Sequence, residues 1–209
     1  MTPRTLAKAL AGLPVAALYE AAGRRGALPP YLKPIGRARQ LAGPAFPVRC
    51  TGSSNIAIHR AVYAARPGDV LVIAQDRRRE RALIGDMLVL AAKLERLGGI
   101  VLDGFVRDVA DLERMNFPIF CRGGAVEGPL KTPKPSLKAS SAIRIESVTV
   151  CRGDFVRGDA DGVVILPQCD LKSLLAKAKA RLQKEKNLRL QMKKSGKRLG
   201  TLLGIPLGK

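Results

Sequence analysis

Two apolar segments of strand length, separated by a helical segment, constrain the fold of this chain more than any other feature. Residues 70–74 and 100–103 are largely apolar runs typical of buried strands, and apolar residues recur at helical spacing over 87–97. A strand, a helix and a strand in this order form a right-handed crossover between parallel strands. The sequence therefore predicts an α/β fold, in which the start of the helix and the loop after the second strand lie at the same end of the sheet.

The remaining segments predict one main domain over 1–170 and a basic helix and tail over 171–209. Helices are expected at 6–24, 55–65, 109–115 and 170–198, and strands at 45–50, 118–121, 142–150 and 162–166, with a turn at 157–159. In the last helix, Leu171, Leu174, Leu175, Ala178 and Leu182 form an apolar stripe. This stripe predicts that the helix docks on the domain.

The net charge of +20 is concentrated at the C-terminal end of the chain. Residues 172–209 hold twelve Lys and Arg against Glu185 alone, a net charge of +11. A solvated helix and a surface that binds RNA or an acidic protein both explain such a run, and the sequence leaves this choice open.

Cysteine, aromatic and hydropathy patterns argue against several classes of protein. The four cysteines at 50, 121, 151 and 169 form no C-x-x-C pair, which argues against a zinc knuckle. We expect them to be small buried residues of a protein in the reducing cytoplasm. Aromatic residues are too scarce for a platform that stacks single-stranded nucleic acid. The apolar run 10–18 contains Pro14 and precedes Glu20, so it predicts a helix rather than a signal peptide, and no run is long enough to span a membrane.

A group of polar residues falls at the predicted carboxyl end of the sheet, where open α/β sheets bind ligands. Arg107 offers a planar donor fork for a carboxylate, and Asp108 offers a hard oxygen ligand for Mg²⁺ or Mn²⁺. Asp86 opens the preceding helix, where the unpaired amides of Met87 and Leu88 can hold a second anionic oxygen. Purely structural roles are also open to these residues: Asp86 as a helix cap, and Arg107 with Asp108 as a surface ion pair.

The spacing of these residues resembles the D-x20-R-D-x2-E/D signature of the RraA-like family, with Asp86, Arg107, Asp108 and Asp111 at its positions. Residues 64–73 (AARPGDVLVI), 101–108 (VLDGFVRD), 117–120 (FPIF), 153–154 (GD) and 158–164 (GDADGVV) also resemble segments of that family. The resemblance covers roughly residues 15–168 and implies a layered β-sandwich flanked by helices, assembled as a trimer or hexamer.

The resemblance also implies an activity, because the family includes metal-dependent pyruvate aldolases and oxaloacetate decarboxylases. It implies Asp108 as the ligand of Mg²⁺ or Mn²⁺, Arg107 as the group that binds the pyruvyl oxygens, the Met87 and Leu88 amides as substrate donors, and Asp86 as the holder of a water for proton transfer. A C-terminal glutamate of a neighbouring subunit assists these aldolases, and Glu185 is the candidate here. The expected substrate is a 4-hydroxy-2-oxo acid or oxaloacetate, cleaved to release pyruvate.

One loop departs from the family pattern, and one alternative function stays open. The family has an acidic, glycine-rich loop where this chain has Gln75 to Arg81, with arginines at 77, 78, 79 and 81 that either recruit a more acidic substrate or form a subunit contact. The same family contains non-catalytic regulators that bind the RNA-degradation machinery. In such a protein the basic tail would bind a ribonuclease or RNA.

Overall fold

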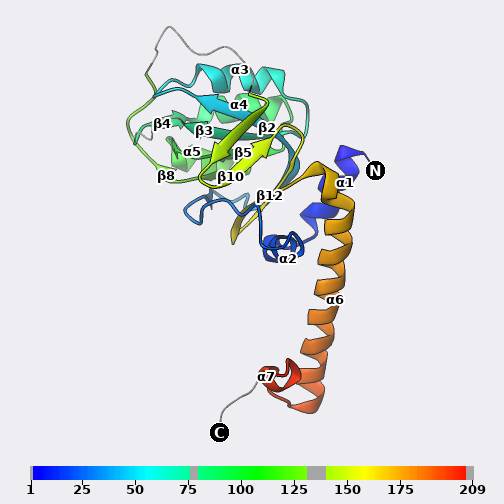
Figure 1. Cartoon of the computed structure of the whole chain (residues 1–209). Helices are drawn as coiled ribbons and strands as arrows, with labels where there is room; N and C mark the ends of the chain where they lie inside the picture. Colours follow the sequence, from blue (N-terminus) through cyan, green and yellow to red (C-terminus); the bar gives the residue numbers. More distant parts are fainter. Residues whose placement is uncertain (1, 76–79, 131–139, 206–209) are drawn as a thin grey trace.

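The computed structural model describes residues 2–75, 80–130 and 140–205. The expected α/β class, with sheets flanked by helices and a basic C-terminal helix, is confirmed (Figure 1). The main sheet has the strand order β1-β7-β5-β3-β2-β11-β12. Its strands are β1 (Lys33–Ile35), β7 (Ile119–Cys121), β5 (Gly99–Leu102), β3 (Val70–Gln75), β2 (Leu41–Cys50), β11 (Phe155–Asp159) and β12 (Gly162–Leu166).

The centre of this sheet is parallel, as the strand–helix–strand order predicts. The strands β2, β3, β5 and β7 pair in parallel, and β1, β11 and β12 add antiparallel edges. All six residues of β3 are buried: Leu71 and Ile73 pack in one apolar cluster, and Val70, Val72 and Ala74 in another. Because alternate residues of a strand face opposite sides, the continuous apolar run indicates cover on both faces, and this prediction is confirmed.

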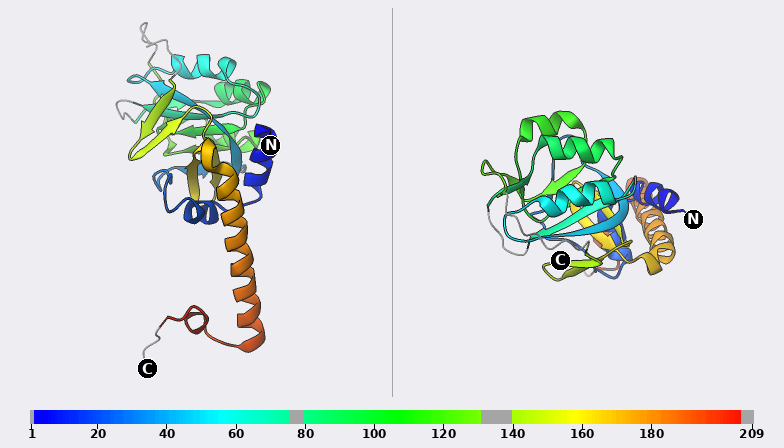
Figure 2. Two further views of the ribbon diagram at one scale, coloured as in Figure 1. Left: turned by 45° about the vertical axis from the view of Figure 1, so that its right-hand side comes forward. Right: turned by 90° about the horizontal axis from the view of Figure 1, so that it is seen from above.

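Three short helices cover one face of the sheet, and further helices pack at its β11–β12 side (Figures 1 and 2). The first group is α3 (Ile56–Ala64), α4 (Asp86–Leu94) and α5 (Val109–Met115), and the second is α1 (Pro3–Ala11), α2 (Val15–Ala21) and the start of α6 (Leu171–Ser195). A 3-10 turn (Gln168–Asp170) precedes α6, and α7 (Leu199–Leu202) follows it.

The helix α6 begins on the domain and then leaves it. Leu171, Leu174, Leu175 and Ala178 are buried and Leu182 packs against them, so the predicted apolar stripe is confirmed. The remaining turns project away from the sheets (Figure 2). The apolar packing therefore continues across position 170, and only the distal part of the helix is separate from the core. None of the described helices is long and apolar enough to cross a membrane.

Three short strands that the sequence analysis missed form a second parallel sheet, β4-β6-β8. The strands β4 (Ala82–Ile84), β6 (Phe105–Val106) and β8 (Gly123–Gly124) follow β3, β5 and β7, respectively, along the chain. The small sheet therefore repeats the neighbour order of the larger one at the carboxyl ends of its strands.

Two other expectations about strands are wrong. The segment predicted as one strand over 142–150 is a hairpin of β9 (Ala142–Ile145) and β10 (Val148–Cys151), and Glu146 in its turn has a left-handed backbone with φ of 49°. The segment predicted as a turn at 157–159 lies within β11, and the chain reverses immediately after it.

The expectation that all four cysteines are buried is wrong for two of them. Cys50 and Cys121 are buried, whereas Cys151 and Cys169 are exposed, and all four are free thiols. Cys151 is the last residue of β10, and Cys169 lies in the short 3-10 turn before α6. A side chain at such a position has few neighbours to cover it.

Candidate active site at the edge of the small sheet

Five of the six predicted site residues meet at the carboxyl edge of the small parallel sheet. Gly85 and Asp86 follow β4, and Arg107 and Asp108 follow β6. Because β4 and β6 are parallel neighbours, their carboxyl ends lie together, and the Arg107 amide donates to the Ile84 carbonyl at 2.9 Å. The nearness that the crossover argument predicted between the start of α4 and the segment after β5 is confirmed.

Arg107 and Asp108 form a pair that stays open to solvent. The Arg107 Nε lies 3.3 Å from Asp108 Oδ2, and the two side chains are 50% and 34% exposed. The Asp86 amide approaches the same Asp108 oxygen at 3.4 Å. The arrangement therefore joins a guanidinium, a carboxylate and a helix N-terminus at one point of the surface.

Gly85 makes this close approach feasible because it has no side chain. A Cβ at position 85 would collide with Asp108 Oδ2 and would lie 3.1 Å from Arg107 Nε. The backbone of Gly85 is extended, with φ of −128°, so its conformation alone does not demand glycine. The space that a Cβ would fill is the reason for a glycine here.

Asp108 has a left-handed backbone conformation, with φ of 58° and ψ of 38°. It caps α5, and its carbonyl accepts the amides of Asp111 and Leu112 at 2.9 and 3.0 Å. Such a conformation is unfavourable for residues other than glycine, although Asp and Asn tolerate it better than most. The hydrogen bonds at the start of α5 therefore hold the Asp108 backbone in a conformation that directs its carboxylate toward Gly85.

The start of α4 offers amide donors, as predicted. Gly85 occupies the cap position, Asp86 is the first helical residue, and the first helical bond runs from the Val89 amide to the Gly85 carbonyl. The amides of Met87 and Leu88 thus lie in the first turn, where no intrahelical acceptor exists. The Met87 side chain is exposed and the Leu88 side chain is buried, so Leu88 anchors this turn in the core.

A loop after β8 approaches the guanidinium of Arg107 from the other side. A Cβ on Gly128 would lie 2.8 Å from the Arg107 Nη1. Arg81 holds this loop through an ion pair of 3.0 Å with Glu127 and a hydrogen bond of 3.1 Å to the Gly128 carbonyl. Arg81 thus has a structural partner, whereas arginines 77, 78 and 79 lie outside the described residues.

Several contributors to this region escaped the sequence analysis. The buried Asp103 carboxylate pairs with Arg122 at 2.7 Å, and Arg122 also donates to the Tyr31 hydroxyl at 2.7 Å and stacks over its ring. Ser53 and Ser54 follow β2 and are buried, and their hydroxyl oxygens have no hydrogen-bond partner among the described residues. Arg122 and the two serines come shortly after predicted strands and Asp103 ends one, which was the only signal that the sequence offered. Tyr31 had no such signal.

Cys121, at the end of β7, is unsuited to act as a nucleophile. Burial raises the pKa of its thiol to about 11, and the thiol contacts the Gly123 carbonyl. A thiol with so high a pKa stays protonated at neutral pH, whereas the reactive form of cysteine is the thiolate.

Glu185 and Asp111 lie apart from this group of contacts. Glu185 pairs with Arg181 at 3.1 Å within α6, on the part of the helix that leaves the domain (Figure 1). The Asp111 carboxylate pairs with Arg114, one turn along α5. Within one chain, the structure therefore brings together Asp86, Met87, Leu88, Arg107 and Asp108, and leaves Glu185 outside.

Comparison with known proteins identifies the family. A family model described as RraA-like, aldolase/RraA, matches residues 15–165, well over half of the chain. The chain belongs to the RraA-like family. The residues around β4 and β6 all lie within the matched region.

Relatives within the RraA-like family carry names of two kinds. A protein of Halalkalibacterium halodurans named "Putative 4-hydroxy-4-methyl-2-oxoglutarate aldolase" is 37% identical over 148 residues, which are 71% of this chain and 70% of that protein. The crystal structure of Streptomyces coelicolor RraAS2, described as an unusual member of the RNase ES inhibitor RraA protein family, matches with a TM-score of 0.78 and 25% identity. That match covers 88% of this chain and 96% of the other.

A third match shows how far the RraA-like fold extends along the chain. An uncharacterized protein of Pseudomonas syringae has a solved structure that matches with a TM-score of 0.78 and 24% identity, covering 96% of this chain and 98% of the other. Coverage of that extent takes in most of α6. The long C-terminal helix is therefore part of a fold that a solved structure shares.

The donor chemistry at the edge of the small sheet fits a hard divalent cation. The Asp108 side chain is 34% exposed, and Asp86, the first residue of the adjacent helix α4, adds a second carboxylate to this region. Over 2–75, 80–130 and 140–205, the structure contains no group of three or more His, Cys, Asp or Glu side chains placed to hold a metal ion. Such a sparse set is unlike a closed zinc site and fits Mg²⁺, which commonly keeps several waters beside one or two carboxylates.

Proposed function

We propose that this chain is a divalent-metal-dependent lyase that cleaves 4-hydroxy-2-oxo acids to release pyruvate and decarboxylates oxaloacetate. The observation that carries the proposal is the pair of Arg107 and Asp108 beside the first turn of α4. A regulator that only binds another protein has no need for a carboxylate ligand next to a carboxylate-binding arginine. The aldolase name of the Halalkalibacterium halodurans relative supports the same activity.

Different residues are assigned to the metal ion and to the substrate. Asp108 would hold Mg²⁺ or Mn²⁺, and Asp86, at the start of the adjacent helix, would orient a water for proton transfer. Arg107 binds the carboxylate of the 2-oxo acid, because a guanidinium matches two carboxylate oxygens at once. The first-turn amides of Met87 and Leu88 hold a further substrate oxygen. When bound, the ion supplies a Lewis acid that polarises the 2-oxo group.

The chemical step then proceeds as follows. The water oriented by Asp86 accepts the proton of the 4-hydroxyl group, the C3–C4 bond breaks to leave an aldehyde or ketone, and the electron pair of that bond forms the enolate of pyruvate. Arg107 stabilises the charge that develops on this enolate, which is the kind of preorganised electrostatic help that lowers such barriers. The same water then returns this proton to C3. With oxaloacetate, carbon dioxide leaves in place of the aldehyde or ketone.

The proposal includes an assembly and a location. A trimer or hexamer would allow Glu185 of a neighbouring subunit to approach the site, because α6 extends away from its own domain (Figure 1). Light scattering should then report at least three subunits, and an active monomer would remove Glu185 from the mechanism. The four free thiols support a reducing compartment such as the cytoplasm.

The decisive experiment measures pyruvate release with a coupled assay on 4-hydroxy-4-methyl-2-oxoglutarate and on oxaloacetate. We expect turnover with Mg²⁺ or Mn²⁺ and none in excess EDTA. Arg107→Lys should lower kcat/KM by about 10²-fold, because an ammonium cannot reproduce the bidentate fork. Arg114→Lys, in an exposed ion pair on α5, is the matched control and should stay within about 2-fold.

A regulator of RNA degradation is the second candidate, favoured by the likeness to RraAS2 and by the basic surface of α6. The same experiment separates the two functions. Turnover that survives EDTA refutes the metal-dependent lyase. No turnover of either substrate under any metal condition, together with tight RNA or ribonuclease binding, replaces it with the regulator.

A further inference from the structure

A second candidate site lies at the opposite end of the main sheet. A cavity of about 870 Å³ is bounded by α1, by the turns that precede β3 and β5, and by the turn that leads into β11. The proposed lyase site follows the other ends of β3 and β5. Six residues of β3 separate the two ends, which is about 20 Å of extended chain. The cavity is therefore distinct from the site around Arg107.

The charge of this cavity is strongly one-sided. Four arginines line it, Arg4, Arg66, Arg96 and Arg152, and Asp69 is its one acidic residue. Asp69 is already engaged, because its Oδ2 accepts the Arg66 amide at 2.9 Å. In the part of the chain that the structure describes, none of the four arginines forms an ion pair. Four arginines thus line one cavity that has a single carboxylate in its lining.

The loops that carry these arginines are tied to each other through their backbones. The Gly68 amide donates to the Arg96 carbonyl at 2.8 Å, and the Gly98 amide donates to the Asp69 carbonyl at 2.7 Å. A Cβ on Gly98 would lie 2.6 Å from the Gly68 carbonyl oxygen, so the two turns are in close backbone contact. The backbone segments that carry Arg66 and Arg96 are therefore fixed relative to each other before any ligand arrives.

The turn between β10 and β11, which forms another side of the cavity, is also attached to the sheet. The Gly153 amide donates to the Ala45 carbonyl at 3.1 Å, which joins the turn after β10 to β2. The Arg152 guanidinium stacks over the Phe46 ring at 4.1 Å from its centre. Stacking of this kind limits the rotamers of the side chain and leaves its edge free to donate hydrogen bonds.

We infer that this cavity binds a small molecule with two or more adjacent phosphate groups, such as an inorganic polyphosphate or a nucleoside polyphosphate. Arginine pairs with phosphate oxygens through two parallel hydrogen bonds, and several arginines on a rigid frame match several phosphates. The volume lies within the range of small-molecule sites. The aromatic residue of the lining, Phe155, is buried, so the cavity offers no stacking surface of the kind that single-stranded nucleic acids use.

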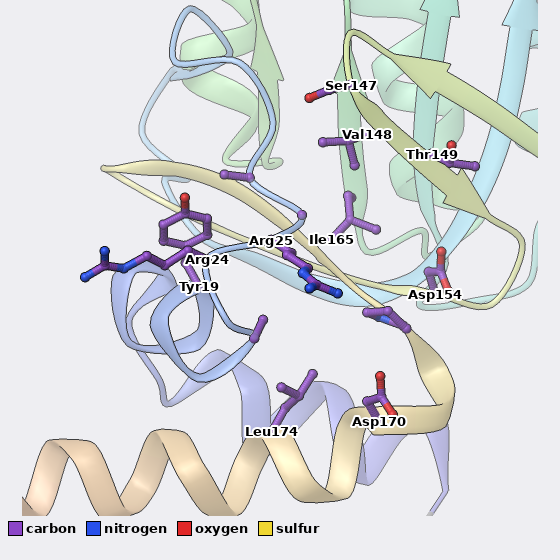
Figure 3. Close-up of a pocket in the computed structure, with 14 residues that line it drawn as sticks. Tyr19, Arg24, Arg25, Ser147, Val148, Thr149, Asp154, Ile165, Asp170 and Leu174 are labelled. Carbon is purple, nitrogen blue, oxygen red and sulfur yellow. The ribbon is translucent and has the colours of Figure 1, made fainter.

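A second cavity provides an internal contrast. It measures about 610 Å³ and lies between α2, the β9–β10 hairpin and the start of α6 (Figure 3). Its lining contains Arg24 and Arg25 together with Asp154 and Asp170, so its formal charge is balanced. Arg24 is also paired with Glu20. Size alone therefore does not define the phosphate site, and the unbalanced arginines distinguish the first cavity.

Isothermal titration calorimetry tests the inference with inorganic triphosphate and with ADP as separate probes, at a physiological salt concentration. We expect one site per chain for triphosphate. Arg66→Gln combined with Arg96→Gln should raise its Kd at least about tenfold, because two of the four phosphate-binding groups are lost. Tighter binding of ADP than of triphosphate would mean that a nucleoside adds contacts, whereas weaker binding would mean that the phosphates alone are recognised.

The control removes the same charge elsewhere. Arg60→Gln combined with Arg189→Gln changes two exposed arginines outside the cavity and should alter the Kd by less than about 2-fold. An equal loss in both double variants would show attraction to the overall charge of +20 and would overturn the inference. Absence of binding by the wild-type protein overturns it too. The same holds if a twelve-nucleotide RNA binds through Arg66 and Arg96 and triphosphate does not.

Discussion

Arginines at the two ends of the main sheet lie in opposite electrostatic settings. At the carboxyl end, Arg107 lies 3.3 Å from the Asp108 carboxylate, beside the first turn of α4. At the amino end, four arginines share a cavity with Asp69, whose carboxylate is bound to a backbone amide. A mixed pair can hold a cation and a carboxylate together, whereas an unbalanced group selects a polyanion. In the two proposed sites, the same residue type would therefore serve two kinds of recognition, depending on its neighbours.

Arg157 shows a third setting for arginine, in which the group is purely structural. It is 2% exposed, and it donates to the carbonyls of Leu10, Leu13 and Leu41 at 3.0 to 3.3 Å. It also donates to Ala11 and Gly158. Burial lowers the pKa of this guanidinium, and the charge of Asp159 acts in the opposite direction. Its donors connect the end of α1 to β2 and β11, which form one side of the arginine cavity.

The largest effect is expected from Arg157→Met. Methionine fills a similar volume but leaves several buried carbonyls without a donor, so the free energy of unfolding should fall by about 3 kcal/mol or more. Urea denaturation followed by circular dichroism measures this change. Arg66→Met, on an exposed side chain of the cavity, is the control and should change it by less than about 0.5 kcal/mol. An equal loss of unfolding free energy in the two variants would show that Arg157 is no more important for stability than an arginine of the cavity.

The next largest effect is expected from Gly85→Ala at the carboxyl end of the sheet. The added Cβ would displace the Asp108 carboxylate and crowd Arg107, so kcat/KM for pyruvate release should fall by about 10²-fold with little loss of stability. Gly12→Ala is the control, because a Cβ there meets only one atom, at 3.8 Å. Wild-type activity in Gly85→Ala would show that the contact between Gly85 and Asp108 is unrelated to catalysis. Triphosphate binding at the other end should be unchanged in both variants.

The parts of the fold that the sequence predicted are those with a clear periodicity. The strands β3 and β5 and the helix α5 lie within one or two residues of their predicted positions, because their apolar residues face a core. The strands β4, β6 and β8 were missed because two or three residues show no period, and β8 consists of two glycines. The hairpin over 142–151 was missed because its turn at Glu146 and Ser147 contains no glycine, asparagine or proline.

The two sites also differ in how far the sequence could predict them. The nearness of Asp86 to Arg107 and Asp108 follows from one local crossover, so the sequence indicated it. The arginine cavity draws its residues from four separate segments, and their meeting depends on the complete topology. The Asp103–Arg122–Tyr31 contacts likewise join positions far apart in the chain. Contacts between residues far apart in the chain cannot be predicted from the spacing of residues in one sequence.

The smallest effect is expected from deletion of residues 193–209. This deletion tests whether the basic tail contributes to either of the two proposed sites. The helix α6 spans 25 residues, about 37 Å, and its buried residues all lie in the first eight positions. The deletion keeps those turns and keeps Glu185. It removes none of the residues proposed to bind the metal, the 2-oxo acid or the phosphates. Metal-dependent pyruvate release and triphosphate binding should both stay within about 2-fold of the full chain.

Binding of RNA or of an acidic protein should instead weaken in the truncated chain, because the deletion removes exposed lysines and arginines of the basic segment. If that binding arises from counterion release at phosphates, it should also fall steeply with added salt, and less steeply once the tail is gone. Measurement of turnover, triphosphate binding and RNA binding for both chains at two salt concentrations separates the three surfaces. A folded truncated protein that has lost turnover would place the tail in the active site, and one that has lost triphosphate binding would extend the cavity to α6.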